Sequence, residues 1–168
     1  SAEYAAAALG VAPGDTAICS TGLIGARLPM DLVLAGVDAA CGQLSADGGD
    51  LADRAIMTTD TVPKTAAATR EGWSVGGMAK GAGMLAPALA TMLVVLTTDA
   101  VVDPATLDGV LRSATSRTFD RIDSDGCMST NDTVLLLSSG ASGVQPSIED
   151  LTEAVTEVCA TLARALIA

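Results

Sequence analysis

Three stretches of the chain repeat apolar residues at the spacing of an amphipathic helix. The first runs from Pro29 to Leu44, the second follows Asp103-Pro104, and the third follows Ser147. Residues three and four apart lie on one face of a helix, so each stretch predicts a helix with one apolar side. Asp103 and Ser147 suit the N-cap, and proline suits the first helical position. The apolar positions are Leu32, Val33, Val37, Ala40 and Leu44; then Leu107, Val110, Leu111 and Ala114; then Ile148, Leu151, Val155, Val158, Leu162 and Leu166.

Shorter apolar runs between these helices predict strands. The clearest is Thr91 to Thr98, which has the composition of a buried strand. Because strands alternate with helices, the sequence predicts an α/β fold with layered packing. Further strands are predicted at 16–20, 55–59, 73–78 and 132–138, the end of a helix at 1–9, a glycine-rich turn at 21–25 and a polar loop at 65–72.

Composition narrows this picture. The 168 residues suit one domain, so residues 1–168 are predicted to form one α/β region. Apolar residues make up 49% but aromatic residues only 2%, so Ala, Val, Leu and Gly must fill a closely packed core. The chain begins without methionine, in the middle of a predicted helix. We therefore expect it to be part of a longer polypeptide.

Charge and hydropathy exclude several kinds of partner. The formal net charge is −11 and the nine basic residues form no stripe, so we expect no nucleic-acid partner and interpret the acidity as a source of solubility. No apolar run approaches the roughly 18 residues of a membrane helix, and the start shows no signal-peptide pattern. We expect a cytoplasmic protein with no membrane partner.

Cysteine and histidine usage limits the possible chemistry. The four cysteines lie far apart, which argues against a zinc site and a disulfide scaffold and predicts reduced, mostly buried thiols. The chain has no histidine, so it contains neither a Ser-His-Asp triad nor a Cys-His pair. The acidic residues Asp123, Asp125 and Asp132 do not fit a calcium loop, because Gly126 and Val134 fall at the wrong positions. We therefore predict no metal.

The segment Gly76 to Thr91 carries the most chemical information. A dinucleotide fingerprint would need a helix after Gly81-x-Gly83, but Pro87 and an apolar strand follow. A P-loop would need Ser or Thr directly after Gly-Lys, which the segment lacks. The remaining hypothesis is a self-cleaving junction, in which Thr91 Oγ attacks the carbonyl of Ala90 and becomes a new N-terminal residue. Its freed α-amine could then act as general base, as in threonine nucleophiles that use their own amine. A structural threonine at a strand start is the alternative.

Four longer motifs resemble the ornithine acetyltransferase family of arginine biosynthesis, also called glutamate N-acetyltransferase or ArgJ, and most closely its actinobacterial branch. They occur in the family's order and cover most of the chain. They are Cys19-Ser-Thr-Gly-Leu-Ile-Gly25, Thr58-Thr-Asp-Thr-Val-Pro-Lys64, Lys80-Gly-Ala-Gly-Met-Leu-Ala-Pro followed by Ala90-Thr91-Met-Leu93, and Ser124-Asp-Gly-Cys-Met-Ser-Thr-Asn-Asp-Thr133.

The resemblance implies a role for each matching residue. Thr91 would be the nucleophile exposed by cleavage after Ala90, and Thr21 with Gly22 would form the oxyanion hole. Thr61, Lys80 and Thr91 would contact the substrate. The implied fold is a layered α/β sandwich of the self-processing, N-terminal-nucleophile-like type. The family's N-terminal region, its glutamate-bearing glycine-rich segment and its terminal segment have no counterpart in this sequence, and the loop at 65–72 is shorter than usual.

The activity implied is acetyl transfer from N2-acetylornithine to glutamate through an acetyl-threonine intermediate. No cofactor is required, although acetyl-CoA is a possible alternative donor. The implied partners are these small substrates and the other part of the cleaved polypeptide, in an oligomer of α/β heterodimers. One alternative is an N-terminal-nucleophile amidase or aminopeptidase that uses water as acceptor. Another is an inactive fragment that needs a partner segment.

Overall fold

The computed structural model describes residues 1–23, 25–82, 85–86, 89–90, 92–123, 126 and 131–168. It divides into two compact units, Ser1–Ala52 and Asp53–Ala168. Within the described part of the chain, no helix is long and apolar enough to cross a membrane.

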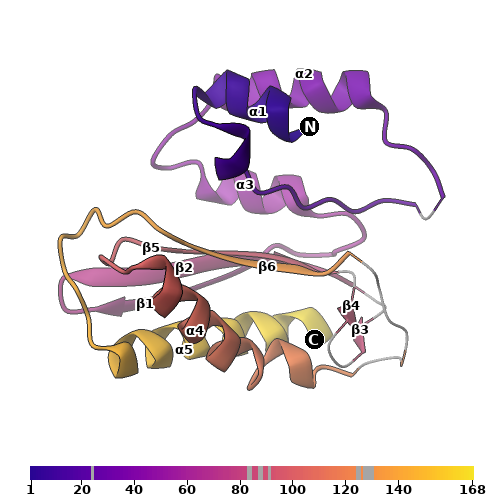
Figure 1. Cartoon of the computed structure of the whole chain (residues 1–168). Helices are drawn as coiled ribbons and strands as arrows, with labels where there is room; N and C mark the ends of the chain where they lie inside the picture. The colour runs from indigo at the N-terminus through magenta and orange to yellow at the C-terminus, as the bar shows by residue number, and fades with distance from the viewer. Residues whose placement is uncertain (24, 83–84, 87–88, 91, 124–125, 127–130) are drawn as a thin grey trace. The chain divides into compact units, whose positions relative to one another are not determined.

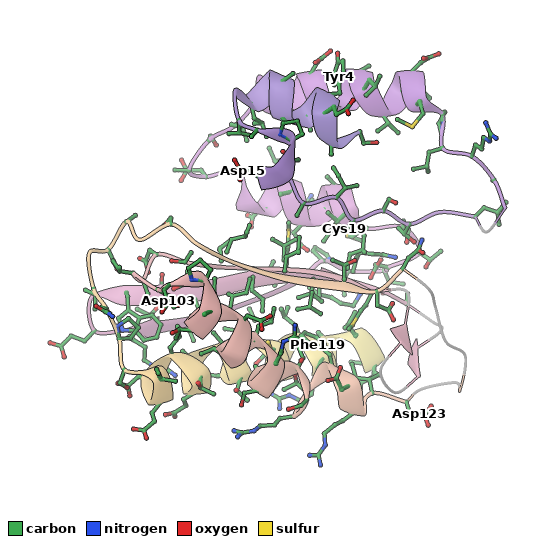
Figure 2. The ribbon with its side chains drawn as sticks, viewed as in Figure 1. Tyr4, Asp15, Cys19, Asp103, Phe119 and Asp123 are labelled. Carbon is green, nitrogen blue, oxygen red and sulfur yellow. The ribbon has the colours of Figure 1, made fainter. Side chains whose placement is uncertain are left out.

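The first unit is a small helical assembly. It contains α1 (Ala2–Leu9), the 3₁₀ turn η1 (Pro13–Asp15) and α2 (Met30–Cys41), and α3 (Gly49–Ile56) crosses its boundary. α1 ends where Gly10 adopts a left-handed φ of 71°, which glycine tolerates without strain. α1, which carries Tyr4 (Figure 2), packs against α2. Tyr4 Oη donates a 2.7 Å hydrogen bond to Asp38 Oδ2. Among the described residues of this unit only Ala6 is buried.

The second unit is built on a four-stranded sheet (Figure 1). Its strands are β1 (Lys64–Arg70), β2 (Trp73–Lys80), β5 (Leu93–Thr98) and β6 (Thr133–Ser138), in the order β1-β2-β5-β6. β1 with β2 and β2 with β5 pair antiparallel, whereas β5 and β6 run parallel. The short strands β3 (Leu85–Ala86) and β4 (Leu89–Ala90) pair separately.

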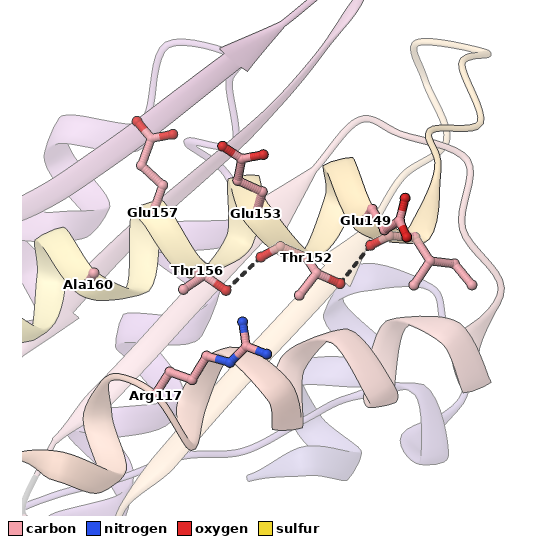
Figure 3. A pocket seen from close by; sticks show the side chains of 8 residues that line it. Arg117, Glu149, Thr152, Glu153, Thr156, Glu157 and Ala160 are labelled. Carbon is pink, nitrogen blue, oxygen red and sulfur yellow. Dashed lines mark hydrogen bonds between the residues drawn. The ribbon is translucent and has the colours of Figure 1, made fainter.

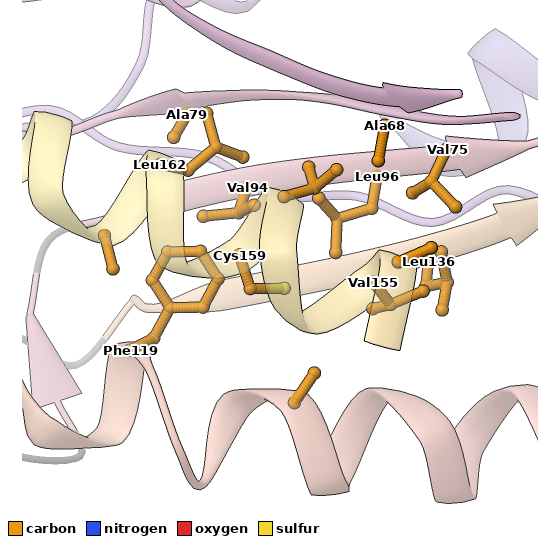
Figure 4. Packing of buried hydrophobic residues seen from close by; sticks show 14 of the residues in the cluster. Ala68, Val75, Ala79, Val94, Leu96, Phe119, Leu136, Val155, Cys159 and Leu162 are labelled. Carbon is orange, nitrogen blue, oxygen red and sulfur yellow. The ribbon is translucent and has the colours of Figure 1, made fainter. Parts of the chain in front are cut away.

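Two helices cover one face of this sheet (Figure 1). α4 (Pro104–Thr115) and the 3₁₀ turn η2 (Phe119–Arg121) connect β5 to β6, and α5 (Ile148–Ile167) lies across β1 and β2. Val94, Leu96 and Leu136 pack against Val155 and Leu162 of α5 in the buried core (Figure 4). The core is built mostly from Ala, Val and Leu, as the composition predicts.

Gly77 shows how closely the layers approach. A Cβ added there would lie 2.5 Å from Leu96 Cδ2 and 3.2 Å from Leu162 Cδ1, closer than packed side chains allow. The absence of a side chain at this position therefore lets α5 approach the middle of the sheet.

The three helices with strong apolar spacing and the strands at 73–78, 91–98 and 132–138 are confirmed, with small shifts of their ends. Asp103 Oδ1 caps α4 by accepting from Ala105 N and Thr106 N, each at 3.0 Å. Ser147 Oγ caps α5 by accepting from Asp150 N at 3.0 Å. The α/β class is confirmed.

Three local predictions are wrong. Residues 16–20 join no ladder among the described residues, although Thr16 has extended backbone angles. Residues 55–59 contain no strand, because Ala55 and Ile56 complete α3. Residues 65–72 are mostly strand, since β1 pairs with β2 through a two-residue turn in which Gly72 adopts a φ of 80°. Thr and Ala gave β1 too weak an apolar signal, and its pairing with β2 decided its structure.

Candidate active site

One end of the four-stranded sheet gathers Lys80, which the sequence singles out, with three further charged residues, Asp60, Lys64 and Asp132. In the ladder, Lys80 at the end of β2 lies opposite Leu93 at the start of β5, and Leu93 pairs with Thr133 at the start of β6. Lys64 at the start of β1 lies opposite Ala79. The residues just outside these strand ends therefore come together in space although they are far apart in the sequence.

Lys80 is a buried cation at this end. Only 3% of the residue is exposed, and its Nζ makes no hydrogen bond or ion pair with any residue that the structure describes. Burial lowers the pKa of Lys80, the nearby charge of Lys64 lowers it further, and the carboxylates of Asp60 and Asp132 oppose this by raising it. A buried ammonium group in this setting is suited to pairing with an incoming carboxylate.

Asp60 and Lys64 form a buried ion pair beside Lys80. Lys64 Nζ donates to Asp60 Oδ1 at 2.5 Å, and the two side chains are 7% and 0% exposed. Asp60 Oδ1 also accepts from Gly81 N at 2.8 Å, and Asp60 Oδ2 accepts from Thr58 N at 3.3 Å. Burial alone would raise the pKa of Asp60, but the bonds from Lys64, Gly81 and Thr58 outweigh it, so the net pKa lies below the usual value.

Asp132 lies at the start of β6 and binds the start of β5. Its Oδ1 accepts a 3.1 Å hydrogen bond from Met92 N, and Thr133 N donates to Met92 O at 3.1 Å. Burial raises the pKa of Asp132, while the Met92 bond and the charge of Lys80 lower it without cancelling the effect of burial. Met92 is the residue that follows Thr91 in the sequence, so Asp132 fixes the backbone directly after the predicted nucleophile.

Thr61 borders a hollow at the same end of the sheet. The hollow measures about 600 Å³, and its walls are residues 61–64, Gly81, Ala82 and the chain segment 165–168. Another hollow, of about 310 Å³, lies on the α4 side and is bordered by Met92, Asp132 and Thr133. One hollow is therefore bordered by Lys64 and the other by Asp132.

The sequence-predicted site residues fall into three sets. Thr61 and Lys80 lie at the same end of the second unit, where Thr61 and Gly81, the residue after Lys80, border one hollow. Thr21 is half-buried and Gly22 exposed, both in the first unit. Ala90 ends β4, and Thr91 lies outside the described residues.

Sequence reasoning missed Asp60, Lys64 and Asp132 as individual site residues. Asp60 and Lys64 stand inside the second family-like motif, and Asp132 stands inside the fourth. An acidic residue four positions before a lysine, in a motif already assigned to the site, was the available signal. Only the ladder register shows that both carboxylates face the same end of the sheet as Lys80.

A separate hollow of about 580 Å³ lies along α5 and carries no comparable chemistry (Figure 3). It is lined by Arg117 and by the acidic residues Glu149, Glu153 and Glu157. Thr152 and Thr156 donate to helix carbonyls at 2.6 Å, and Glu157 accepts from Arg70 at 2.8 Å. These are the contacts of a solvated helix face.

One of the three described cysteines is unsuited to act as a nucleophile. Cys159 is buried in the core, and burial raises the pKa of its thiol to about 12. Cys19 and Cys41 are half-buried free thiols. No described group of three or more His, Cys, Asp or Glu side chains is arranged to hold a metal ion.

Comparison with known proteins agrees with the motifs. The model of the ArgJ family matches residues 1–168. The chain belongs to the ArgJ family. It is 65% identical over 166 residues to the arginine biosynthesis bifunctional protein ArgJ of Streptomyces coelicolor, covering 99% of this chain and 43% of that protein. It is also 64% identical to the ArgJ protein of Mycobacterium leprae, covering 94% of this chain and 41% of the relative.

These matches confirm the predicted family and its actinobacterial branch. The chain spans less than half the length of these curated ArgJ relatives. The structure therefore locates only those residues that fall within this part of the ArgJ proteins.

Proposed function

We propose that this chain carries the catalytic centre of an acyltransferase that moves an acetyl group from N2-acetylornithine to glutamate. Family membership and the relatives' name, arginine biosynthesis bifunctional protein, support this assignment. The observation that carries this assignment is the buried cation Lys80. Lys80 lies at the end of the sheet where β5 begins, and the first residue of β5, Leu93, follows Thr91 by two positions in the sequence. Both proposed substrates bear a carboxylate that such a cation can bind.

The first half-reaction forms an ester on Thr91. Thr91 Oγ attacks the acetyl carbonyl carbon of N2-acetylornithine and its proton passes to the Thr91 α-amine. The C–N bond then breaks, and the departing ornithine nitrogen takes that proton. The products are free ornithine and acetyl-Thr91, and no redox step or cofactor is needed.

The second half-reaction regenerates the enzyme. The amine of glutamate attacks the acetyl-ester carbonyl and gives a proton to the Thr91 α-amine. The C–Oγ bond then breaks and Thr91 Oγ takes that proton, which leaves N-acetylglutamate and the free hydroxyl of Thr91. The hydroxyl of Thr21 and the N–H of Gly22 are proposed to stabilise the oxyanion in both steps, where one donor is worth roughly 10²–10³ in rate. A Cβ at Gly22 would make only an ordinary 3.5 Å contact with Leu28 Cδ2. Packing among the described residues therefore leaves room for a side chain, which fits a glycine kept for access by ligand.

The four-stranded sheet is proposed to be one layer of a self-processing α/β sandwich. α4 and α5 cover one face, whereas Leu137, which points to the other face, is 52% exposed. An apolar side chain on the second face is suited to packing against another layer. The remainder of the cleaved polypeptide is the partner proposed for that role.

Two measurements on the full-length protein test this function. Intact-mass analysis should give two pieces that meet at Ala90/Thr91. Release of ornithine from N2-acetylornithine should require glutamate and yield N-acetylglutamate. Release of acetate at the same rate without glutamate would instead favour the amidase, in which water is the acceptor. A single uncut chain with no acyl transfer would overturn the proposal.

A further inference from the structure

We infer that Asp60 is a positioning residue that fixes the two predicted substrate-binding segments, around Thr61 and Lys80, in one arrangement. The inference rests on the proposed function for what these segments bind. The positioning role goes beyond the proposed function because it belongs to a side chain that does not itself contact the substrate.

The contacts of Asp60 join three parts of the site. Its carboxylate accepts from Thr58 N in the segment that carries Thr61, from Gly81 N directly after Lys80, and from Lys64 Nζ at the start of β1. The carboxylate is fully buried, so water does not compete for these bonds. A shift of either substrate-binding segment would break a hydrogen bond to one of the two carboxylate oxygens of Asp60.

The backbone at Gly81 needs this support. β2 ends at Lys80, and Gly81 adopts a φ of 156°, a conformation that other residues rarely adopt. The 2.8 Å bond from Gly81 N to Asp60 Oδ1 holds the chain where it leaves the sheet. The direction that the backbone takes directly after Lys80 therefore depends on Asp60.

Charge balance gives Asp60 a second means of positioning. Lys64 and Lys80 are both buried and repel each other, and Asp60 is the anion that attracts both. Without its negative charge, two cations would face each other in a poorly hydrated space. Lys80 would then turn away from the place where it meets the substrate carboxylate.

The opposite end of β2 provides a matched control. Asp99 Oδ1 accepts a 2.7 Å hydrogen bond from Ser74 N, so it too is a carboxylate that holds a backbone N–H at a strand end. No predicted site residue lies there. Asp60→Asn and Asp99→Asn make the same chemical change at the two ends of one strand.

The kinetic experiment compares wild type with both variants in the full-length enzyme. For Asp60→Asn we expect the KM for N2-acetylornithine to rise about tenfold with kcat changed less than about threefold, because binding in ground state and transition state is lost together. For Asp99→Asn we expect KM within about twofold of wild type. Equal KM values in the two variants would overturn the inference while leaving the acyltransferase proposal intact.

Amide hydrogen exchange separates this inference from the proposed function. In Asp60→Asn, exchange should accelerate about tenfold or more in the segments 58–64 and 80–82 and stay unchanged near Ser74, with the reverse in Asp99→Asn. If wild type transfers no acetyl group, the proposed function fails and exchange alone decides whether Asp60 positions these segments. Unchanged exchange in 58–64 and 80–82, or acceleration of the whole chain, would contradict the positioning role.

Discussion

The two ends of the four-stranded sheet differ in the side chains that lie beside the strand ends. At the end where Asp99 lies, backbone groups at and just beyond the strand ends are bonded by a carboxylate and by hydroxyls. Ser74 N donates to Asp99, Thr98 Oγ1 donates to Ser74 O at 2.7 Å, and Ser138 Oγ donates to Ala100 O at 2.5 Å. At the end where Lys80 lies, two lysines and the carboxylates of Asp60 and Asp132 are gathered instead.

The difference between the two ends indicates which side chains the fold itself requires. Hydroxyls and one half-buried carboxylate are sufficient to terminate strands, so buried lysines are not required for that purpose. Burying Lys80 costs stability because its charge is removed from water. The proposed substrate-binding role of Lys80 would account for this cost, and it predicts that the two ends of the sheet respond differently to substitution.

The largest effect is expected when Thr91, two residues before β5 in the sequence, is compared with Thr98, the last residue of β5. Thr91→Ala should abolish both chain cleavage and acetyl transfer, because it removes the only proposed nucleophile. Thr98→Ala, which loses the bond to Ser74 O, should lower the free energy of unfolding by about 1–2 kcal/mol and leave cleavage intact. Intact mass, an acyl-transfer assay and denaturant unfolding measure the three quantities. Cleavage of Thr91→Ala at the same bond would show that the intramolecular mechanism is wrong.

The two buried lysines should respond in opposite directions. Lys64→Met leaves Asp60 buried without its cation and should destabilise the protein by about 3 kcal/mol. Lys80→Met removes a buried charge that has no hydrogen bond to a described residue, so it should raise the unfolding free energy by about 1 kcal/mol. Lys80→Met should also reduce kcat/KM about 100-fold, which is the decrease expected when one charge-assisted contact to the substrate is lost.

Denaturant melts of the two variants, together with steady-state kinetics of Lys80→Met, check this pair. A Lys80→Met protein that is less stable than wild type, yet equally active, would show that Lys80 serves the fold and would remove the contrast between the two sheet ends.

The smallest effect is expected in the pH dependence of stability. The pKa of Asp60 is lowered on folding, so the unfolded chain takes up the proton first as the pH falls. Its stabilising contribution is complete above the unfolded pKa of about 3.9 and is lost as the pH falls through the folded value. Asp132 has a raised pKa, so its ionisation opposes folding as the pH rises through the same region.

Asp60→Asn should therefore flatten the acid side of the stability curve, and Asp132→Asn should steepen it. Urea unfolding at a series of pH values below about 5 measures both slopes. Slopes that change in the same direction for the two variants would contradict the opposite environments of the two carboxylates.

Local signals in the sequence were sufficient for the long elements. Asp103-Pro104 and Ser147 mark the starts of α4 and α5, and the apolar spacing after each gives the helix face that meets the sheet. β5 is predicted because an uninterrupted apolar run of strand length has few other uses. The family could be recognised because its motifs are long and keep their order.

Short segments without a strong local preference could not be predicted in the same way. β1 consists largely of Thr and Ala and becomes a strand because β2 offers it a ladder of seven residue pairs. Residues 16–20 have strand-like composition but find no such partner among the described residues. The α2 helix forms as predicted, yet Leu32 and Leu44 of the predicted apolar face are each 72% exposed.

The sequence by itself determined the three longer helices α2, α4 and α5, the central strands, the family and the chemistry available to a chain without histidine, because each depends on local periodicity or on residue identity. The tertiary structure decided which charges meet. Asp60, Lys64, Lys80 and Asp132 lie between positions 60 and 132 of the chain and become neighbours because antiparallel and parallel pairing bring four strand ends together. Local sequence cannot specify that register, since it arises from hydrogen bonds between strands and from the packing of α4 and α5 on one face.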